Sequence, residues 1–201
     1  MICENSSVYK NEDFSQDDFA AQEINKSIFQ NCKFRGCVMS EIITNNCVFE
    51  NCDFAFAKMD NSIHNNSGFL NCTFNGAALF ASKLNNCKCT GSSFAKADII
   101  GMAIVGGNYS YTCFAALNLK NMDLVDINFE NADFRNCNLT GAKLQNCNLK
   151  HALLQNANLR DTNLLGANVE GVDFKNLVLK KTKIDITQAV ILAESLGAMV
   201  I

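Results

Sequence analysis

Eleven cysteines give this chain its clearest potential for metal binding or redox chemistry, because thiolates ligate metals and take part in disulfide exchange. Cys32 and Cys37, like Cys47 and Cys52, are separated by four residues. This spacing follows a five-residue period that runs through the chain, so no metal is needed to explain it. Free cysteine also packs as a small apolar residue. We therefore predict buried thiols with no metal and no cofactor, and keep a redox or metal-binding protein as an alternative hypothesis.

The remaining residues argue against an enzyme. Only two histidines are present, His64 and His151, and neither lies in a cluster with carboxylates. The sequence has no glycine-rich phosphate loop and no nucleophile-elbow pattern. We therefore predict no catalytic residues and expect the surface of the protein to be its functional part.

The composition sets further limits on partners and location. The net charge is −3 and the pI is about 5.4, which gives no electrostatic reason to expect direct binding to nucleic acid. Residues 1–10 lack a basic segment followed by an apolar one, and no run of 18 apolar residues is present, so we expect neither export nor a membrane span. The cysteines are then expected to be reduced, in the cytoplasm.

A five-residue period organises the chain. Every fifth residue from Phe14 to Ile184, 35 positions that we call the centres, is apolar except Thr44 and His64, and 13 of the 15 phenylalanines lie there. Two residues before each centre the side chain is usually small. This period matches neither a helix nor a flat strand. It requires a chain that turns a corner every five residues, with one large and one small residue pointing inward.

Residues twenty apart indicate that four such sides close one coil. One column of centres holds phenylalanine at eight of nine positions: Phe14, Phe34, Phe54, Phe74, Phe94, Phe114, Phe134 and Phe174, with Leu154. Coils of twenty residues would stack at the inter-strand spacing of roughly 4.8 Å. We therefore predict an all-β solenoid over residues 13–184, of about 8.5 coils and on the order of 40 Å long, after an N-terminal segment over 1–12.

Two features depart from this pattern. The polar centres Thr44 and His64 should meet on adjacent coils, where they either bond each other inside the core or form a local polar pocket. Between Ile99 and Ile127 the small positions become irregular and include Gly107. We expect a distorted coil there, and leave open whether it is a change of shape, a hinge or a binding bulge.

Residues 185–201 form a separate C-terminal segment. Thr187 is the expected N-cap of a short helix and Gly197 its expected C-cap, before an apolar strand over residues 198–201. A helix this apolar must bury one face, on the end of the solenoid or against another subunit, and we predict a two-fold homodimer. The expected interface residues are Ala189, Leu192, Ala193, Leu196, Met199 and Ile201.

The repeated triplets carry a family resemblance. A-D-F at 132–134, C-N-L at 137–139 and A-N-L at 157–159 resemble the A(D/N)LXX repeat of pentapeptide-repeat proteins, over about 170 of the 201 residues. The resemblance implies a right-handed quadrilateral β-helix.

The C-terminal segment resembles the ending of the Qnr and MfpA quinolone-resistance proteins, K-[IV]-D-x-x-Q-A-x-x-L-x-x-x-L-G-x-x-V. The matching residues are Lys183, Ile184, Asp185, Gln188, Ala189, Leu192, Leu196, Gly197 and Val200. This resemblance implies a protein that dimerises through its C-terminus, binds DNA gyrase or topoisomerase IV by imitating duplex DNA, and confers fluoroquinolone resistance. The unbroken repeat looks more like the members without loops, which tend to inhibit the enzyme.

Imitation of DNA requires negative charge, and the acidic residues form two clusters along the sequence. The expected partner surface consists of Asp13, Asp17, Asp18, Asp123, Asp126, Glu130 and Asp133. The same clusters are explained equally well as solvated faces. The alternative function is a generic protein-interaction scaffold with no topoisomerase role.

Overall fold

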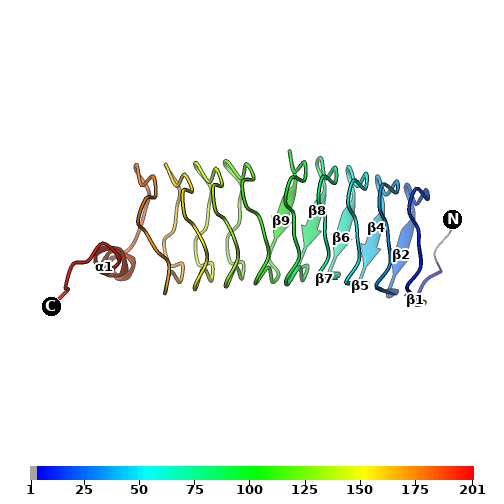
Figure 1. Ribbon diagram of the computed structural model, residues 1–201, viewed down its shortest axis with the longest axis horizontal. Coiled ribbons are helices and arrows are strands. Elements are labelled where there is room, and N and C mark those ends of the chain that lie inside the picture. The colour runs from blue at the N-terminus through cyan, green and yellow to red at the C-terminus, as the bar shows by residue number, and fades with distance from the viewer. Residues whose placement is uncertain (1–3) are drawn as a thin grey trace. The chain divides into compact units, whose positions relative to one another are not determined.

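The computed structural model describes residues 4–201 (Figure 1), and the chain divides into two compact units, Met1–Asn108 and Tyr109–Ile201. We call them unit 1 and unit 2 and describe each by itself. The described elements are β1 (Val8–Lys10), β2 (Glu23–Asn25), β3 (Ile28–Gln30), β4 (Ile43–Asn45), β5 (Val48–Glu50), β6 (Ile63–Asn65), β7 (Gly68–Leu70), β8 (Lys83–Asn85), β9 (Ala103–Val105) and α1 (Ile186–Ser195).

Unit 1 is a parallel solenoid. Its strands form two parallel sheets in the orders β1-β3-β5-β7 and β2-β4-β6-β8-β9, and the second sheet forms one row in Figure 1. Paired residues are twenty apart, as in Tyr9 with Phe29 and Ile24 with Thr44. Each strand therefore pairs with the strand one coil later, and twenty residues make one coil. Because β1 already pairs with β3, the solenoid begins before the boundary expected at residue 13.

Unit 2 repeats the coil with shorter paired segments. Single bridges replace strands, as in Asn118 with Asn138 and Asn138 with Asn158. Turns close its corners, and in one of them the Cys137 amide donates to the Phe134 carbonyl over 3.1 Å. The described chain is thus a parallel β-solenoid with one short C-terminal helix, which confirms the predicted fold class.

The corners explain the many asparagines. The residue two positions after each centre from Phe14 to Leu179 has a positive φ, for example 55° at Asn31, 54° at Asn51 and 70° at Gly91. Asparagine and glycine adopt this left-handed conformation at the lowest cost. A side chain at Gly91 would also meet the Asn71 amide oxygen, 2.2 Å from its Cβ position. One residue in five is therefore selected for its backbone conformation and not for packing.

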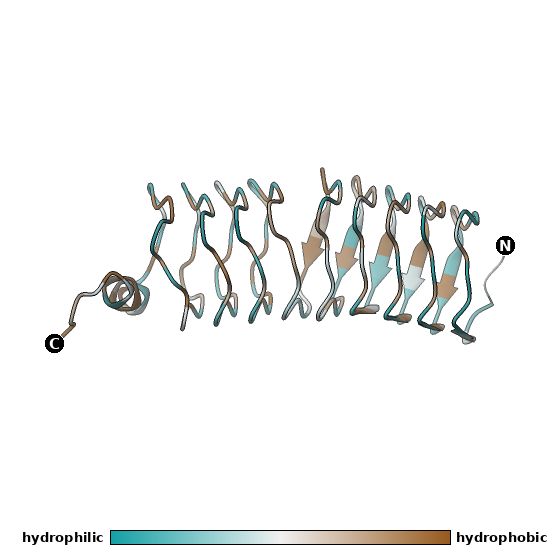
Figure 2. Cartoon of the chain, in the orientation of Figure 1, coloured by the Kyte–Doolittle hydropathy of each residue, from teal (hydrophilic) through white to brown (hydrophobic). Residues whose placement is uncertain are grey.

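The centres form the core. In unit 1 the rings of Phe14, Phe34, Phe54, Phe74 and Phe94 stack with successive centroids 5.0, 4.8, 5.0 and 4.6 Å apart. Phe114 and Phe134 stack at 5.3 Å in unit 2. The predicted aromatic column is confirmed within each unit. Apolar and polar residues alternate along the coils (Figure 2) because successive side chains point in and out.

The irregular stretch contains the consecutive glycines Gly106 and Gly107, with φ of 61° and 99°. Gly107 occupies a small inward position, and a Cβ there would lie 2.1 Å from the carbonyl oxygen of Cys87. No other residue type fits this close approach of two backbones, so the departure from the repeat is a local steric requirement.

Helix α1 begins at a different residue from the one expected. Asp185, and not Thr187, is its N-cap, because the Asp185 carboxylate accepts from the Gln188 amide and the Gln188 side chain accepts from the Asp185 amide. Buried Gln188 also donates to the carbonyls of Leu164 and Ala167, which fastens α1 to the last coils. Gly197 follows the C-cap Leu196 with φ of 92°. The strand expected over residues 198–201 is not formed in the single chain, because none of the described residues pairs with it.

Candidate partner-binding surface

The polar centres are a satisfied part of the core. Thr44 Oγ1 lies 2.8 Å from His64 Nδ1 and 3.1 Å from Ser67 Oγ, and His64 Nε2 lies 3.0 Å from Ser62 Oγ. All four side chains are buried. Burial lowers the pKa of His64 to about 3, so its imidazole is neutral at physiological pH. This geometry confirms mutual hydrogen bonding and gives no polar pocket for a ligand.

The cysteines also serve the solenoid itself. The Cys47 thiol donates to the Ile24 carbonyl over 3.3 Å, and the Cys147 thiol donates to the Leu124 carbonyl over 2.8 Å, in each case one coil back. Burial raises the pKa of Cys87 and of Cys147 to about 12, which suppresses the reactive thiolate. Among the described residues no three potential metal ligands come together. Cys3 lies outside the described residues.

Serine replaces cysteine at the same inward positions because its hydroxyl also bonds the backbone, which the sequence pattern alone does not show. Ser92 Oγ accepts from the Cys72 amide over 2.8 Å and donates to the Phe69 carbonyl over 2.6 Å. A hydroxyl or a thiol can make both contacts, whereas alanine can make neither. The Cys/Ser alternation is therefore a signal of backbone groups that need a side-chain partner at a corner.

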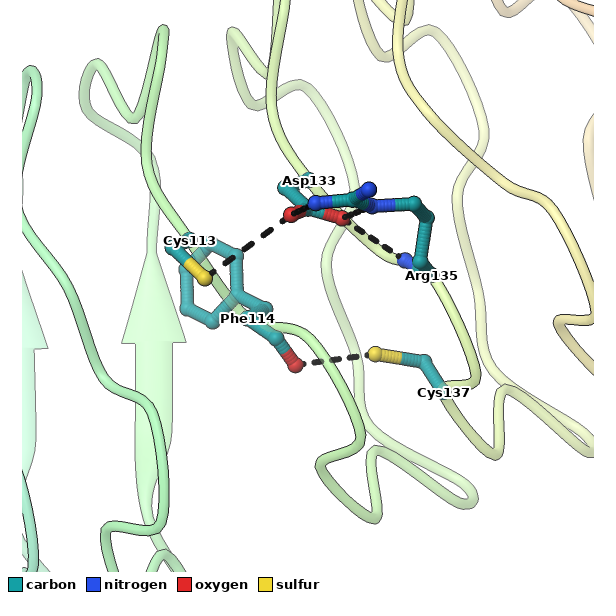
Figure 3. A network of polar contacts seen from close by, with 5 residues as sticks. All are labelled: Cys113, Phe114, Asp133, Arg135 and Cys137. Atoms are coloured by element: carbon teal, nitrogen blue, oxygen red, sulfur yellow. Dashed lines mark hydrogen bonds and ion pairs between the residues drawn. The ribbon is translucent and has the colours of Figure 1, made fainter.

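Cys113 is the one described cysteine that is partly exposed. Its thiol lies 3.9 Å from Asp133 Oδ2, while Arg135 donates to the same carboxylate through Nε at 2.9 Å and Nη2 at 2.7 Å (Figure 3). These bonds from Arg135 lower the pKa of Asp133. The carboxylate is thus neutralised by its neighbour, and this network offers little net charge to a partner.

The expected acidic surface is not one cluster. Asp13 pairs with Lys33 at 3.7 Å and Asp123 with Lys143 at 2.8 Å. Of the others, Asp126 accepts from Asn146, Glu130 from Asn148 and Asp18 from the Ala20 amide, and Asp17 is partly buried. The acids of unit 2 lie on three different sides of its coils, because sequence neighbours separated by a corner point in different directions. Three of the seven expected residues, Asp13, Asp123 and Asp133, are neutralised by a base.

A second set of acids, which includes Asp18 from the expected residues, shares one side of unit 1. We call the side with the centres Phe19, Met39, Met59, Leu79 and Ile99 the acidic side. It carries Asp18, Glu41, Asp60 and Asp98, and Lys58 is its only base among the described residues. The Asp60 and Asp98 carboxylates accept from the amides of Phe80 and Ile100. Those two apolar side chains are 49% and 67% exposed, so an apolar pair lies among acids.

The residues of the expected dimer interface lie in α1 and in the segment that follows it. Leu196 is 60% and Met199 86% exposed, and Ala189 and Ile201 are exposed as well, while Leu192 and Ala193 are half-buried. Ile186, at the first turn, is 86% exposed. The described chain therefore presents several large apolar side chains to water at its C-terminal end. No described helix has the length and apolar character required to cross a membrane.

Comparisons with known proteins match this architecture. Two family models match the chain, a pentapeptide repeat region over residues 113–185 and pentapeptide repeats over residues 26–63. No curated protein sequence matches. Among solved structures, a trypsin-treated form of QnrB1, a plasmid-mediated fluoroquinolone resistance protein, has a TM-score of 0.83 at 22% identity and covers 98% of this chain and 99% of that one.

Two further solved structures resemble the chain with lower TM-scores. Full-length QnrB1 has a TM-score of 0.78 at 20% identity, over 97% of this chain and 99% of that one. HetL, a pentapeptide repeat protein involved in heterocyst differentiation regulation from the cyanobacterium Nostoc, has a TM-score of 0.51 at 21% identity, over 90% and 89% of the two chains. At these identities the likeness establishes a common fold.

Proposed function

The chain belongs to the pentapeptide-repeat family, and we propose that it binds DNA gyrase or topoisomerase IV in the place of DNA and lowers sensitivity to fluoroquinolones. The observation that carries this proposal is the match to QnrB1 over 98% of the chain at a TM-score of 0.83. A match of that extent takes in α1 as well as the coils. In this proposal the protein acts in the cytoplasm by binding the topoisomerase, and not as an enzyme.

The acidic side of unit 1 is the surface that we assign to the enzyme. A protein that holds DNA presents cationic groups to a backbone that carries one charge per roughly 1.7 Å. Glu41, Asp60 and Asp98 form no ion pair with another described residue, so their charges remain available to such groups. Exposed Phe80 and Ile100 add an apolar contact in the last two coils of this surface.

We also propose that two chains associate through α1. Burial of an exposed apolar side chain contributes roughly 25 cal/mol per Å² of apolar surface. Ile186, Leu196 and Met199 are exposed side chains of this kind, and a two-fold dimer is the commonest way in which such side chains are buried between two copies of a chain. The dimer would present two acidic sides to the enzyme.

A supercoiling assay tests the proposal. Purified protein is added to gyrase and relaxed plasmid, with and without ciprofloxacin, and supercoiling and drug-induced cleavage are both measured. Inhibition of supercoiling, or protection from cleavage, at micromolar protein supports the proposal. No effect on either activity, for gyrase and for topoisomerase IV, would leave the alternative of a generic protein-interaction scaffold with no topoisomerase role.

A further inference from the structure

One side of unit 2 carries an excess of positive charge. We call the side with the centres Leu119, Leu139, Leu159 and Leu179 the basic side. Its exposed residues include Lys120, Arg160, Lys180 and Lys181, and Asp161 is its only acid among the described residues. The other charged groups of residues 165–184 lie on neighbouring sides: Glu170, Asp173, Lys175 and Lys183.

The backbone register places these cations on successive coils. The Gly141 amide donates to the Arg160 carbonyl and the Asp161 amide to the Lys180 carbonyl, each over 2.8 Å. Arg160 and Lys180 therefore occupy the same position on adjacent coils, roughly 4.8 Å apart along the solenoid. Lys120 occupies that position two coils before Arg160. Lys120, Arg160 and Lys180 form a straight row over four coils, interrupted only at Thr140, and Lys181 lies beside Lys180 at the corner of the last of these coils.

None of the four cations is neutralised within the described chain. The ion pairs of unit 2 instead involve Arg135, Lys143 and Lys150, each with a carboxylate on its own or an adjacent coil. Lys120, Arg160, Lys180 and Lys181 take part in no ion pair with another described residue. Their charge is therefore available to an external anion.

The neutral residues of the basic side are hydrogen-bonding groups. Asn138 donates to Asn118 over 3.0 Å, and the next position of this ladder is Asn158. Thr140 fills the gap in the row of cations. Amide and hydroxyl side chains, together with Lys and Arg, are the groups that contact phosphate oxygens in protein–DNA complexes. Val178 and Leu179, 47% and 36% exposed, are the large apolar side chains exposed on this side, and both lie in its last coil, whereas a protein-binding patch would have an apolar centre.

The net charge of the whole chain does not reveal the basic side of unit 2. The same position of the twenty-residue repeat is acidic in unit 1, where Asp18, Glu41, Asp60 and Asp98 outnumber Lys58. The two sides nearly cancel in the net charge of −3, which is why composition alone predicts no contact with nucleic acid.

We propose that the basic side of unit 2 binds the phosphodiester backbone of duplex DNA without sequence preference. The row of cations spans three coil spacings, about 14 Å, which is comparable to four phosphates of one strand. Each neutralised phosphate releases a counterion, so up to four contacts give a slope of about −3 to −4 in a plot of log K against log salt. This binding does not depend on contact with a topoisomerase.

Fluorescence anisotropy with a labelled duplex of about 20 base pairs, titrated with the full chain from about 25 mM to about 200 mM salt, tests the proposal. The double variant Arg160→Gln, Lys180→Gln should bind at least about tenfold more weakly at the lowest salt, with a slope about 2 units shallower. The matched control is Lys143→Gln, Lys150→Gln, which removes the same charge from bases already paired with Asp123 and Glu170. It should bind almost as tightly as the wild type.

Three outcomes would overturn the proposal: no binding of the wild type at low salt, a slope near zero, or equal losses in the test and control variants. Binding to an anionic polypeptide such as polyglutamate, with none to the duplex, would indicate an acidic protein partner and would also overturn it. Thermal melts establish that both variants are folded. A protein that inhibits gyrase but fails here would keep its proposed function and lose only this inference.

Discussion

Thr44 Oγ1 lies 2.8 Å from His64 Nδ1 on the adjacent coil, and both side chains are buried in the core. Burial keeps His64 neutral and lowers its pKa from 6.5 to about 3. Between these two values the unfolded chain binds a proton that the folded chain does not. Stability is therefore complete above pH 6.5, falls as the pH drops toward 3, and falls no further below that.

This linkage predicts that His64 alone causes a measurable part of the loss of stability in acid. The free energy of unfolding should fall by about 1.4 kcal/mol per pH unit within the window, on account of His64. Urea denaturation at about pH 7 and about pH 4.5 should therefore show a loss that is about 3 kcal/mol smaller in His64→Leu than in the wild type. The control His151→Leu, at an exposed corner, should lose as much as the wild type. Equal losses in both variants would refute the assignment.

The hydroxyl of Ser92 bonds the backbone at a corner, so variants at this position should differ in stability by graded amounts. Ser92→Ala leaves the Cys72 amide and the Phe69 carbonyl without their buried partner, and should cost about 1–3 kcal/mol in urea denaturation. Ser92→Cys keeps a donor and acceptor at the same place and should cost less. If Ser92→Ala is as stable as Ser92→Cys, the thiols and hydroxyls at these positions only fill space and their hydrogen bonds do not stabilise the fold.

The exposed residues that follow α1 predict a change of assembly without a change of fold. Leu196→Asp with Met199→Asp should convert a dimer into a monomer in light scattering, while the melting temperature of the chain at low concentration stays nearly constant, because both side chains are exposed. The control Ile100→Asp, equally exposed but in unit 1, should remain dimeric. A wild type that is monomeric at high micromolar concentration would contradict the proposed dimer.

From the acidic side we predict which carboxylates of this protein contribute to its binding of gyrase. Asp60→Asn with Asp98→Asn removes two charges but keeps an oxygen that can accept from the Phe80 and Ile100 amides. This variant should inhibit or protect gyrase at least several-fold less well than the wild type. The matched control Asp13→Asn with Asp53→Asn keeps the same local hydrogen bonds, and its carboxylates are already paired with Lys33 and Arg35. It should behave as the wild type.

Much of the fold follows from the sequence, because burial of one residue in five is a strong and regular requirement. The stacked phenylalanines from Phe14 to Phe94 are predictable for this reason. The start of α1 is not, since Thr187 has the side chain of an N-cap but the reciprocal bonds are made by Asp185 and Gln188.

The candidate surface was harder to predict than the fold. Asp17 and Asp18, or Asp123 and Asp126, cluster along the chain, yet neighbours in a solenoid are residues about twenty apart. Lys143 neutralises Asp123 from the next coil, which no local pattern shows. Charges become informative only after they are assigned to sides, and it is this step that separates the acidic side of unit 1 from the basic side of unit 2.

The central claim is that the protein takes the place of DNA on a type II topoisomerase. The most direct test is competition, in which a labelled duplex bound to gyrase at about 150 mM salt is titrated with the full chain and the displaced duplex is measured. Salt of that strength suppresses the weaker contact of the chain itself with DNA. The account predicts displacement by the wild type and by the Asp13→Asn, Asp53→Asn control, and weaker displacement by Asp60→Asn, Asp98→Asn. A duplex that stays bound to gyrase at saturating protein would contradict it.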